Sequence, residues 1–340
     1  GFLYGLLYRI QKFFAKDEKR KMTEYYFAPL EGITGYLFRQ VHHRHFPQVD
    51  KYFMPFLVPH EKRTFNGKEL REIDPRNNEG MQVIPQIMTN KAEDFISTAR
   101  KLQERGYREV NLNLGCPSKT VVSKGRGSGF LAYPQELESF LDRIFQKLDM
   151  KISVKTRIGV EDEEEFSQLL AIYNQYPLEE LIIHPRLQRD QYKFPVHMNI
   201  FEQAEKESIN VLCYNGDLIS REGIEKLKKE FPMVGRFMIG RGLLRNPGLV
   251  QEMKTGHILS KRQLREYHDD LYQVYRDTQC GERNVLFRMK ELWGFMIDLF
   301  EEPKKYGKKI RKAQRLWEYE EAVNQLFEER DFQRDNTGVC

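Results

Sequence analysis

Short β-rich runs alternate with helical patterns from residue 25 to residue 242. Most intervals between the runs carry apolar residues at helical spacing, as Phe95, Ala99 and Leu102 do. Strands that alternate with helices favour a parallel sheet, and eight such units predict an α/β fold, the (β/α)8 or TIM barrel. A doubly wound open sheet is the rival architecture. The eight β-rich runs are residues 25–29, 51–56, 83–88, 109–115, 152–159, 181–186, 210–217 and 236–242.

Two parts of the chain depart from this alternation. Residues 57–82, after the second run, lack helical periodicity, so this crossover is expected to be irregular. From about residue 258 the β-rich runs stop, and three helical patterns follow at residues 264–274, 285–296 and 316–327. We therefore predict an N-terminal extension at residues 1–22, a barrel domain at residues 23–257 and a smaller all-helical C-terminal domain at residues 258–340.

Composition limits the class of protein. Of 340 residues, 40% are hydrophobic and 31% are charged, which is typical of a globular protein with a sizeable core. The formal net charge of +5 fits a polyanionic partner without requiring one. The cysteines stand at positions 116, 213, 280 and 340 and form no CxxC pair. Neither a disulfide framework nor a metal site is therefore predicted, and a reducing cytoplasm is the expected location.

The N-terminal extension is apolar and basic. Arg9 and Lys12 interrupt its apolar run and no small-residue cleavage site follows, which argues against a signal peptide. No run of the chain reaches the length of a membrane span, so stable membrane association is not expected. Nothing in the sequence indicates an obligate protein partner. Strand-like sequence begins three residues after Met22, and we expect Met22 to be the natural start.

Polar residues gather at the ends of the predicted strands. The carboxyl ends of barrel strands form the rim where chemistry takes place, so these residues are interpreted together. Asn215, Gly216 and Asp217 end the seventh run, and Gly240 and Arg241 end the eighth. Loops at these two positions recurrently bind phosphate through backbone N–H groups, although an Asn-Gly pair by itself is usually a turn.

Other rim residues admit two interpretations. Lys155 and Arg157 would either stabilise negative charge at the barrel mouth or pair with acids of the rim. His184 and Gln86 suit a ligand contact and a buried structural contact equally well. Cys116 lies between a glycine and a proline at the end of an alternating apolar run. The residues alone leave its role open, because small buried cysteines are common and no His stands beside it.

Seven motifs follow the predicted strands in one order: APLEG, PQIM, NLGCPSKTV, VKTRIG, IIHPR, YNGD and MIGRG. Their order, together with the Gly-Cys-Pro-Ser-Lys core, resembles the bacterial type of tRNA-dihydrouridine synthase, over residues 24 to about 330. The helical tail also resembles the RNA-binding domain of that family. The resemblance implies a barrel that holds FMN, accepts hydride from NADPH and reduces the 5,6 double bond of a uridine in tRNA.

The resemblance also implies roles for individual residues. Cys116 matches the proton donor of the family, and Asn113 and Arg157 match positions that hold the target uracil. The residues that it assigns to FMN are Ala28, Pro29, Leu30, Gln86, Lys155, His184, Asn215, Gly216, Asp217, Gly240 and Arg241.

The implied chemistry agrees with these residue types. Hydride transfer to carbon 6 of uracil leaves negative charge at carbon 5 and the carbonyl oxygen, so a nearby acid must deliver a proton. A thiol ordinarily keeps its proton at neutral pH, which suits Cys116 without a His partner. A stacked uridine must first be extruded from its RNA, and contacts to the flavin and to phosphates offset that cost.

The segment 303–315 holds seven Lys or Arg and no acid. Given the resemblance, four of its lysines are expected to contact tRNA phosphates, although such a run is often a solvated helix face. These are Lys304, Lys305, Lys308 and Lys309.

Two rival functions stay open: an FMN barrel oxidoreductase for a free small molecule, similar to dihydroorotate or dihydropyrimidine dehydrogenases, and a non-catalytic RNA-binding protein. Flavin uptake separates the second rival from the enzymes.

Overall fold

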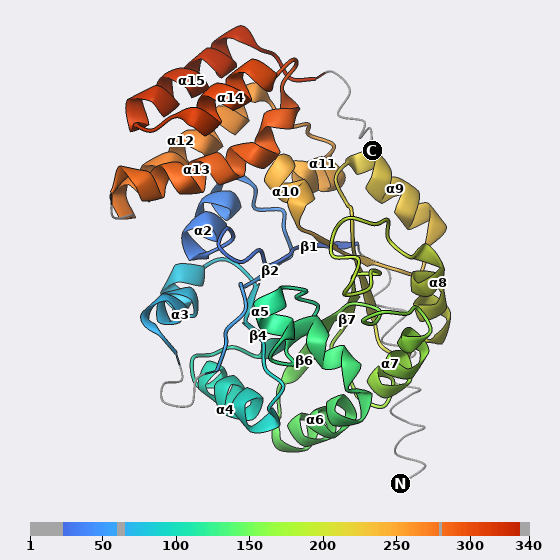
Figure 1. The fold of residues 1–340 in the computed structure, drawn as a ribbon. Helices are drawn as coiled ribbons and strands as arrows, with labels where there is room; N and C mark the ends of the chain where they lie inside the picture. The colour runs from blue at the N-terminus through green and yellow to red at the C-terminus, as the bar shows by residue number, and fades with distance from the viewer. Residues whose placement is uncertain (1–22, 60–64, 279–280, 334–340) are drawn as a thin grey trace.

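The computed structural model describes residues 23–59, 65–278 and 281–333; the predicted N-terminal extension, with Met22, lies outside the described residues. Within these ranges, nine short strands form one parallel sheet that curls into a barrel, with helices around it (Figure 1). The strands are β1 (Glu24–Phe27), β2 (Lys51–Phe53), β3 (Val83–Ile84), β4 (Gln86–Ile87), β5 (Glu109–Leu114), β6 (Lys151–Thr156), β7 (Leu181–Ile183), β8 (Leu212–Asn215) and β9 (Arg236–Ile239).

Pro85 explains why nine strands make an eight-stranded barrel. It separates β3 from β4, and proline has no backbone N–H with which to continue a ladder. β3 pairs with β2, β4 pairs with β5, and the Pro85 carbonyl still accepts a hydrogen bond of 2.9 Å from the Asn111 N–H. The two pieces are therefore one strand that closes the barrel, and the predicted (β/α)8 architecture is confirmed.

Helices follow the strands around the barrel. In the crossover predicted to be irregular, residues 57–82, the described residues 57–59 and 65–82 contain a short helix and a 3-10 turn at Pro75–Asn78. The short helix is capped by Asn66, whose side chain and backbone exchange hydrogen bonds with Glu69. The barrel helices are α2 (Tyr36–His45), α3 (Gly67–Glu72), α4 (Ala92–Gln103), α5 (Lys119–Val122), α6 (Pro134–Lys147), α7 (Glu165–Tyr173), α8 (Met198–Glu207), α9 (Arg221–Glu230), α10 (Arg241–Arg245) and α11 (Leu249–Thr255).

Within the described residues, four α-helices follow the barrel: α12 (Lys261–Thr278), α13 (Glu282–Met296), α14 (Lys304–Lys312) and α15 (Leu316–Glu329). Helix α12 packs against α2 and α13 packs against α10, so the helical region sits against one side of the barrel (Figure 1). The sequence predicts three of these helices; α14 is the unpredicted one, and it contains the basic run. The boundary predicted at residues 257–258 falls between α11 and α12 and stays a prediction. Among the helices that the structure describes, none combines the length and apolar character needed to cross a membrane.

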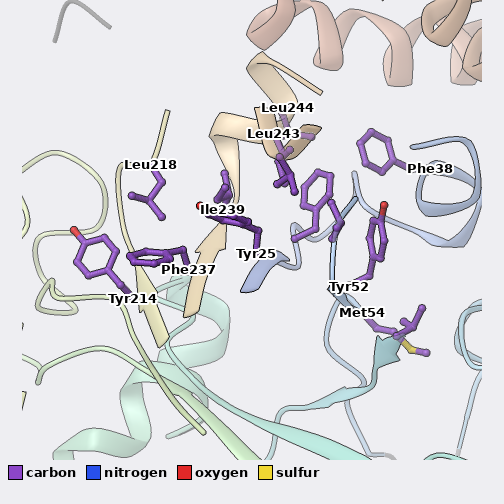
Figure 2. Close-up of a cluster of buried hydrophobic side chains, with 14 of the residues drawn as sticks. Tyr25, Phe38, Tyr52, Met54, Tyr214, Leu218, Phe237, Ile239, Leu243 and Leu244 are labelled. Atoms are coloured by element: carbon purple, nitrogen blue, oxygen red, sulfur yellow. The ribbon is translucent and has the colours of Figure 1, made fainter. Parts of the chain in front are cut away.

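Alternate residues of each strand face two different cores. In β1, Tyr25 packs outside the barrel, toward the surrounding helices, whereas Tyr26 packs inside it. Figure 2 shows part of the outer core, where Phe237 lies beside Tyr25 and Tyr214, and Leu243 of α10 lies between this group and Phe38 of α2. The inner core is a separate cluster: Tyr26, Ala28, Phe53, Ile84, Ile182, Cys213 and Met238. Strand alternation therefore decides which side chains can reach the barrel interior.

Charged side chains form the floor of the barrel at the amino ends of the strands. Lys51, at the start of β2, lies 3.0 Å from Glu109 of β5 and 3.1 Å from Glu180, which precedes β7. Arg236 of β9 lies 2.7 Å from Glu180, and the Tyr26 hydroxyl donates to the same carboxylate at 2.9 Å. All five side chains are buried. Because each charge is paired, this charged floor closes the barrel from below without leaving an isolated ion.

We predict that Glu180→Leu lowers the free energy of unfolding by about 3–5 kcal/mol, because Lys51 and Arg236 each lose a buried carboxylate. Equilibrium unfolding in urea measures the change. The control is Glu202→Leu, which breaks an exposed ion pair with Lys206 and should leave the urea midpoint unchanged. A Glu180 variant as stable as the wild type would contradict the role of the floor.

Candidate active site at the carboxyl end of the barrel

A cavity of about 220 Å³ lies where β1, β6, β7, β8 and β9 end. The structure brings to it every residue that the resemblance assigns to FMN except Gln86: Ala28, Pro29, Leu30, Lys155, His184, Asn215, Gly216, Asp217, Gly240 and Arg241. Residues without a predicted role complete the lining: Tyr192, Leu218, Ile219, Met238, Gly242 and Phe295.

Strand alternation explains why residues so distant in sequence meet here. Ala28, Lys155, His184, Asn215 and Gly240 each stand two positions beyond an inward-facing residue of their own strand. The inward direction continues past the apolar core, so these five positions form the upper layers of the barrel interior. The cavity is therefore the open end of the same interior that the charged floor closes below.

Lys155 is an unpaired cation in this cavity. Among the described residues, no carboxylate or other acceptor forms a hydrogen bond with its Nζ. Burial, followed by the positive charge of Arg157, lowers the pKa of Lys155 from 10.5 to about 8, and nearby Cys116 opposes this shift. A Cβ placed on Gly115 would lie 3.9 Å from Lys155 Nζ. Lys155 thus lies between the cavity and the Cys116 loop. A bound anion would pair with its ammonium and stabilise the positive charge.

The end of β7 is held by a charged cluster. Arg186 donates to both carboxylate oxygens of Asp217 and, at 3.0 Å, contacts His184 Nε2. Arg241 also donates to Asp217, at 3.0 Å. Burial, together with the charges of Arg157 and other cations, lowers the pKa of His184 well below its usual value. His184 is therefore neutral, and its Nε2 accepts from the guanidinium while its ring faces the cavity.

Arg157 connects Tyr192, which lines the cavity, to the Cys116 loop. Its Nε donates to the Gly115 carbonyl at 3.0 Å and its Nη1 donates to the Leu187 carbonyl at 2.8 Å. The buried Nη2 atom has no hydrogen-bond partner within the described part of the chain. The guanidinium lies 5.2 Å from the centre of the Tyr192 ring, and Arg241 lies 4.9 Å from the same ring. Unused donor capacity at a buried cation indicates a site for a polar ligand.

Cys116 is half-buried on the loop after β5. The Asn113 side-chain oxygen accepts hydrogen bonds of 3.0 Å from the N–H groups of Gly115 and Cys116, while Ser128 donates twice to the Cys116 carbonyl. A Cβ on Gly127 would come within 2.8 Å of that carbonyl, and Gly127 has a φ of +56°, so only glycine fits there. The thiol is thus carried by a loop held on both sides.

The predicted residues that do not line the cavity are Cys116, Asn113 and Arg157, described above, together with Gln86 and the four lysines of α14. Gln86 is buried below the cavity, where its amide binds Asn111 and Asn113 at 2.7 Å each. The four lysines of the basic run lie exposed on α14, whose buried residues Tyr306 and Ile310 face α15 and α13. No cluster of three or more His, Cys, Asp or Glu suited to a metal ion occurs in the described ranges.

A second cavity, of about 730 Å³, separates the barrel from the helical region. We call it the groove; its barrel side is formed by the loop after β1, α2 and α3, and its other side by α12 and α13. Lys68, Arg71 and Arg288 line it. The groove and the active-site cavity share two walls, because the loop after β1 and helix α13 contribute residues to both.

Sequence reasoning missed Tyr192 and Phe295 as lining residues. Tyr192 is 55% exposed and lies in the long segment between β7 and α8, which has no periodicity to assign it a direction. Phe295 lies beside the apolar stripe of α13 that Leu292 and Met296 define. An aromatic residue beside the buried face of an amphipathic helix indicates that the helix also contacts a second surface or cavity. Phe295 could have been predicted as a lining residue on this basis.

Comparisons with known proteins agree on one family. The family model described as "Dihydrouridine synthase (Dus)" matches residues 26–335. A Bacillus subtilis protein named "Probable tRNA-dihydrouridine synthase 2" is 26% identical over 275 residues, covering 78% of this chain and 83% of its own length. A Synechocystis protein named "Probable tRNA-dihydrouridine synthase 1" is 29% identical over 239 residues, covering 67% and 65%.

Solved structures support the fold. The structure titled "Structure of morphinone reductase in complex with tetrahydroNAD" matches with a TM-score of 0.50 at 11% identity, covering 69% of this chain and 88% of that one. Another, titled "Morphinone reductase", gives a TM-score of 0.50 at 12% identity and covers 69% and 86%. At this level of identity the likeness concerns the barrel architecture alone.

Proposed function

Because the chain belongs to the dihydrouridine synthase family, we propose that it is an enzyme that reduces uridine in tRNA to dihydrouridine, with FMN as its prosthetic group and NADPH as the reductant. One observation carries the proposal. Residues from five separate strand ends line one cavity, and the half-buried Cys116 lies on the loop beside it. That combination suits an enzyme in which a bound ring and a proton donor act on one substrate.

The residues of the cavity fit FMN. Lys155 and Arg241 bring positive charge to the lining, and Asp217 is already bound by Arg186 and Arg241, so an anion would be favoured. A Cβ on Gly216 would come within 3.0 Å of Val196, which makes this a position where backbone alone can approach a phosphate. Bound FMN would supply the hydride that the reduction requires.

The proposed roles of the chain's own residues follow from their contacts. Lys155 would stabilise negative charge on the ring, because its ammonium has no acceptor of its own among the described residues. Arg157, with its unused Nη2, would hold the uracil from the side of the Cys116 loop. Cys116 would then donate its proton to carbon 5 after carbon 6 receives hydride, and the product stays neutral.

The groove favours RNA over a free small molecule. Arg288 in the groove and Phe295 in the cavity lie seven residues apart on α13, about 10 Å along the helix axis. A nucleotide extruded into the cavity would therefore leave its neighbours beside the cations of the groove. A small-molecule dehydrogenase has no use for such a surface. The exposed lysines of α14 would provide a further phosphate contact.

We predict that Cys116→Ala retains FMN and oxidises NADPH but forms dihydrouridine about 10²–10⁴-fold more slowly, because the proton donor is gone. Nucleoside analysis of the tRNA measures the product, and flavin absorbance measures cofactor content. Cys213→Ala is the control: this thiol is buried inside the barrel below the site and should be dispensable. Full activity of Cys116→Ala would rule out its role, and a wild-type protein that takes up no FMN would rule out the flavoenzyme.

We predict that FMN affinity falls as the pH rises through about 8, because Lys155 loses its proton near that pH. A phosphate is already doubly ionised above its second pKa of about 6, so titrations between about pH 7 and pH 9 isolate the lysine. The loss should approach about tenfold per pH unit above pH 8. Lys155→Met should bind weakly at every pH, whereas Lys151→Met, at the exposed start of the same strand, should retain the pH dependence. A flat wild-type profile would contradict this role of Lys155.

We predict that changing Lys304, Lys305, Lys308 and Lys309 to Gln weakens tRNA binding and lowers the slope of log affinity against log salt concentration by about 3, since each lost phosphate contact removes about 0.7–0.9. Filter binding across a salt series measures the slope. A matched control changes four exposed lysines on the outer helices of the barrel, Lys147, Lys206, Lys226 and Lys229. Both variants lower the formal net charge from +5 to +1, that is 5 − 4. Equal slopes in the two variants would leave the α14 lysines without a specific role.

A further inference from the structure

We propose that Asn111 and Ser153, two side chains inside the barrel that no part of the site contains, position the loop that carries Cys116. They do so through a continuous series of hydrogen bonds, the polar ladder, formed by Glu109, Ser153, Asn111, Gln86 and Asn113. The structural part of this inference stands on those contacts. Its chemical consequence, correct placement of the proton donor, rests on the proposed function.

The lower half of the ladder begins at the charged floor. Glu109 accepts a hydrogen bond of 3.1 Å from the Ser153 hydroxyl, and Ser153 Oγ accepts one of 2.9 Å from Asn111 Nδ2. Asn111 Oδ1 in turn accepts from Gln86 Nε2 at 2.7 Å. Ser153, Asn111 and Gln86 are fully buried. The floor is therefore connected to the upper barrel through side chains alone.

The upper half reaches the Cys116 loop. Gln86 Oε1 accepts from Asn113 Nδ2 at 2.7 Å. Asn113 Oδ1 accepts from the backbone N–H groups of Gly115 and Cys116 at 3.0 Å each. These two N–H groups are the top of the ladder, and they place the backbone of Cys116 over the barrel interior.

The direction of every bond in the ladder is fixed from both ends. Backbone N–H groups only donate, so the oxygen of Asn113 must face Cys116 and its nitrogen must face Gln86. The same argument then orients Gln86 and Asn111 in turn. At the bottom, the Glu109 carboxylate, which Lys51 contacts at 3.0 Å, requires a donor from Ser153. No amide in the series can rotate by itself without placing donor against donor or acceptor against acceptor.

Because the ladder is buried, reversing the direction of any one of its hydrogen bonds costs free energy. A donor or acceptor that loses its partner here has no water to replace it, so local misalignment is strongly unfavourable. The Gly115 and Cys116 carbonyls are held separately, by Arg157 and by Ser128. Hydrogen exchange of the Gly115 and Cys116 N–H groups therefore measures the integrity of the ladder, because their carbonyls are held by contacts outside it.

The first test is hydrogen exchange of the segment that contains Gly115 and Cys116 in Ser153→Ala. Loss of the hydroxyl leaves Asn111 Nδ2 without an acceptor, and we expect exchange of these amides to accelerate about tenfold. Tyr173→Phe is the matched control, because it removes another buried hydroxyl that bonds the same strand, at Thr156, outside the ladder. Its exchange at Gly115 and Cys116 should stay within about twofold of the wild type. Equal exchange in the two variants would overturn the proposal.

The second test separates hydrogen bonding from packing. Asn111→Leu removes the acceptor for Gln86, whereas Asn111→Asp keeps it and, with its carboxyl protonated as burial favours, donates to Ser153 Oγ as the Asn111 amide does. We expect the leucine variant to accelerate exchange at least as much as Ser153→Ala, and the aspartate variant to restore near wild-type exchange. If both Asn111 variants accelerate exchange equally, restoring the acceptor for Gln86 does not restore the loop, and the ladder has no positioning role.

The third measurement connects the ladder to chemistry. In Ser153→Ala we expect the kcat for dihydrouridine formation to fall about tenfold, while the KM for tRNA and the rate of NADPH oxidation stay within about twofold. Faster exchange in the variants of a wild-type protein that makes no dihydrouridine would retain the ladder and refute the proposed function. Unchanged exchange in the variants of an active wild-type enzyme would refute the ladder and retain the function.

Discussion

A closed barrel gives its inward-facing side chains no water, so each must find its partner among the others, and the rest of the structure depends on this constraint. At the floor, Lys51 and Arg236 are matched by buried carboxylates. Above the floor, the interior divides into an apolar half, with Ile182 and Met238, and a polar half that begins at Ser153. This pairing of charged and polar side chains inside the barrel ends at its open end.

At that end the site contains buried cations that no carboxylate among the described residues neutralises, and these make it electropositive. Lys155 and Arg157 are cations whose burial lowers their pKa values, because no carboxylate neutralises them directly. Such an arrangement costs the unliganded protein stability that an anionic ligand restores. Both side chains also contact or approach Gly115, so a ligand bound beside Lys155 would lie next to the loop of Cys116.

The sequence predicted the barrel because eight alternations leave few other folds, and it predicted most of the cavity because strand ends converge by topology. What it missed depends on tertiary contacts. Helix α14 has only Tyr306 and Ile310 to bury, too few to stand out among its six cations. Tyr192 is placed by Arg157 and Arg241, which are remote in sequence. For Gln86, the residue type allowed two roles, and only the positions of Asn111 and Asn113 show which partners it has.

Through Phe295, the helical region contributes directly to the cavity at the open end of the barrel. It belongs to α13, yet it forms part of the wall of the active-site cavity. A truncated chain that ends at the barrel would lack this wall, and a chimera with a foreign helical tail would acquire a different one. A sequence change in α13 that alters the surface of the helical region therefore also alters the wall of this cavity, so the two regions must evolve together.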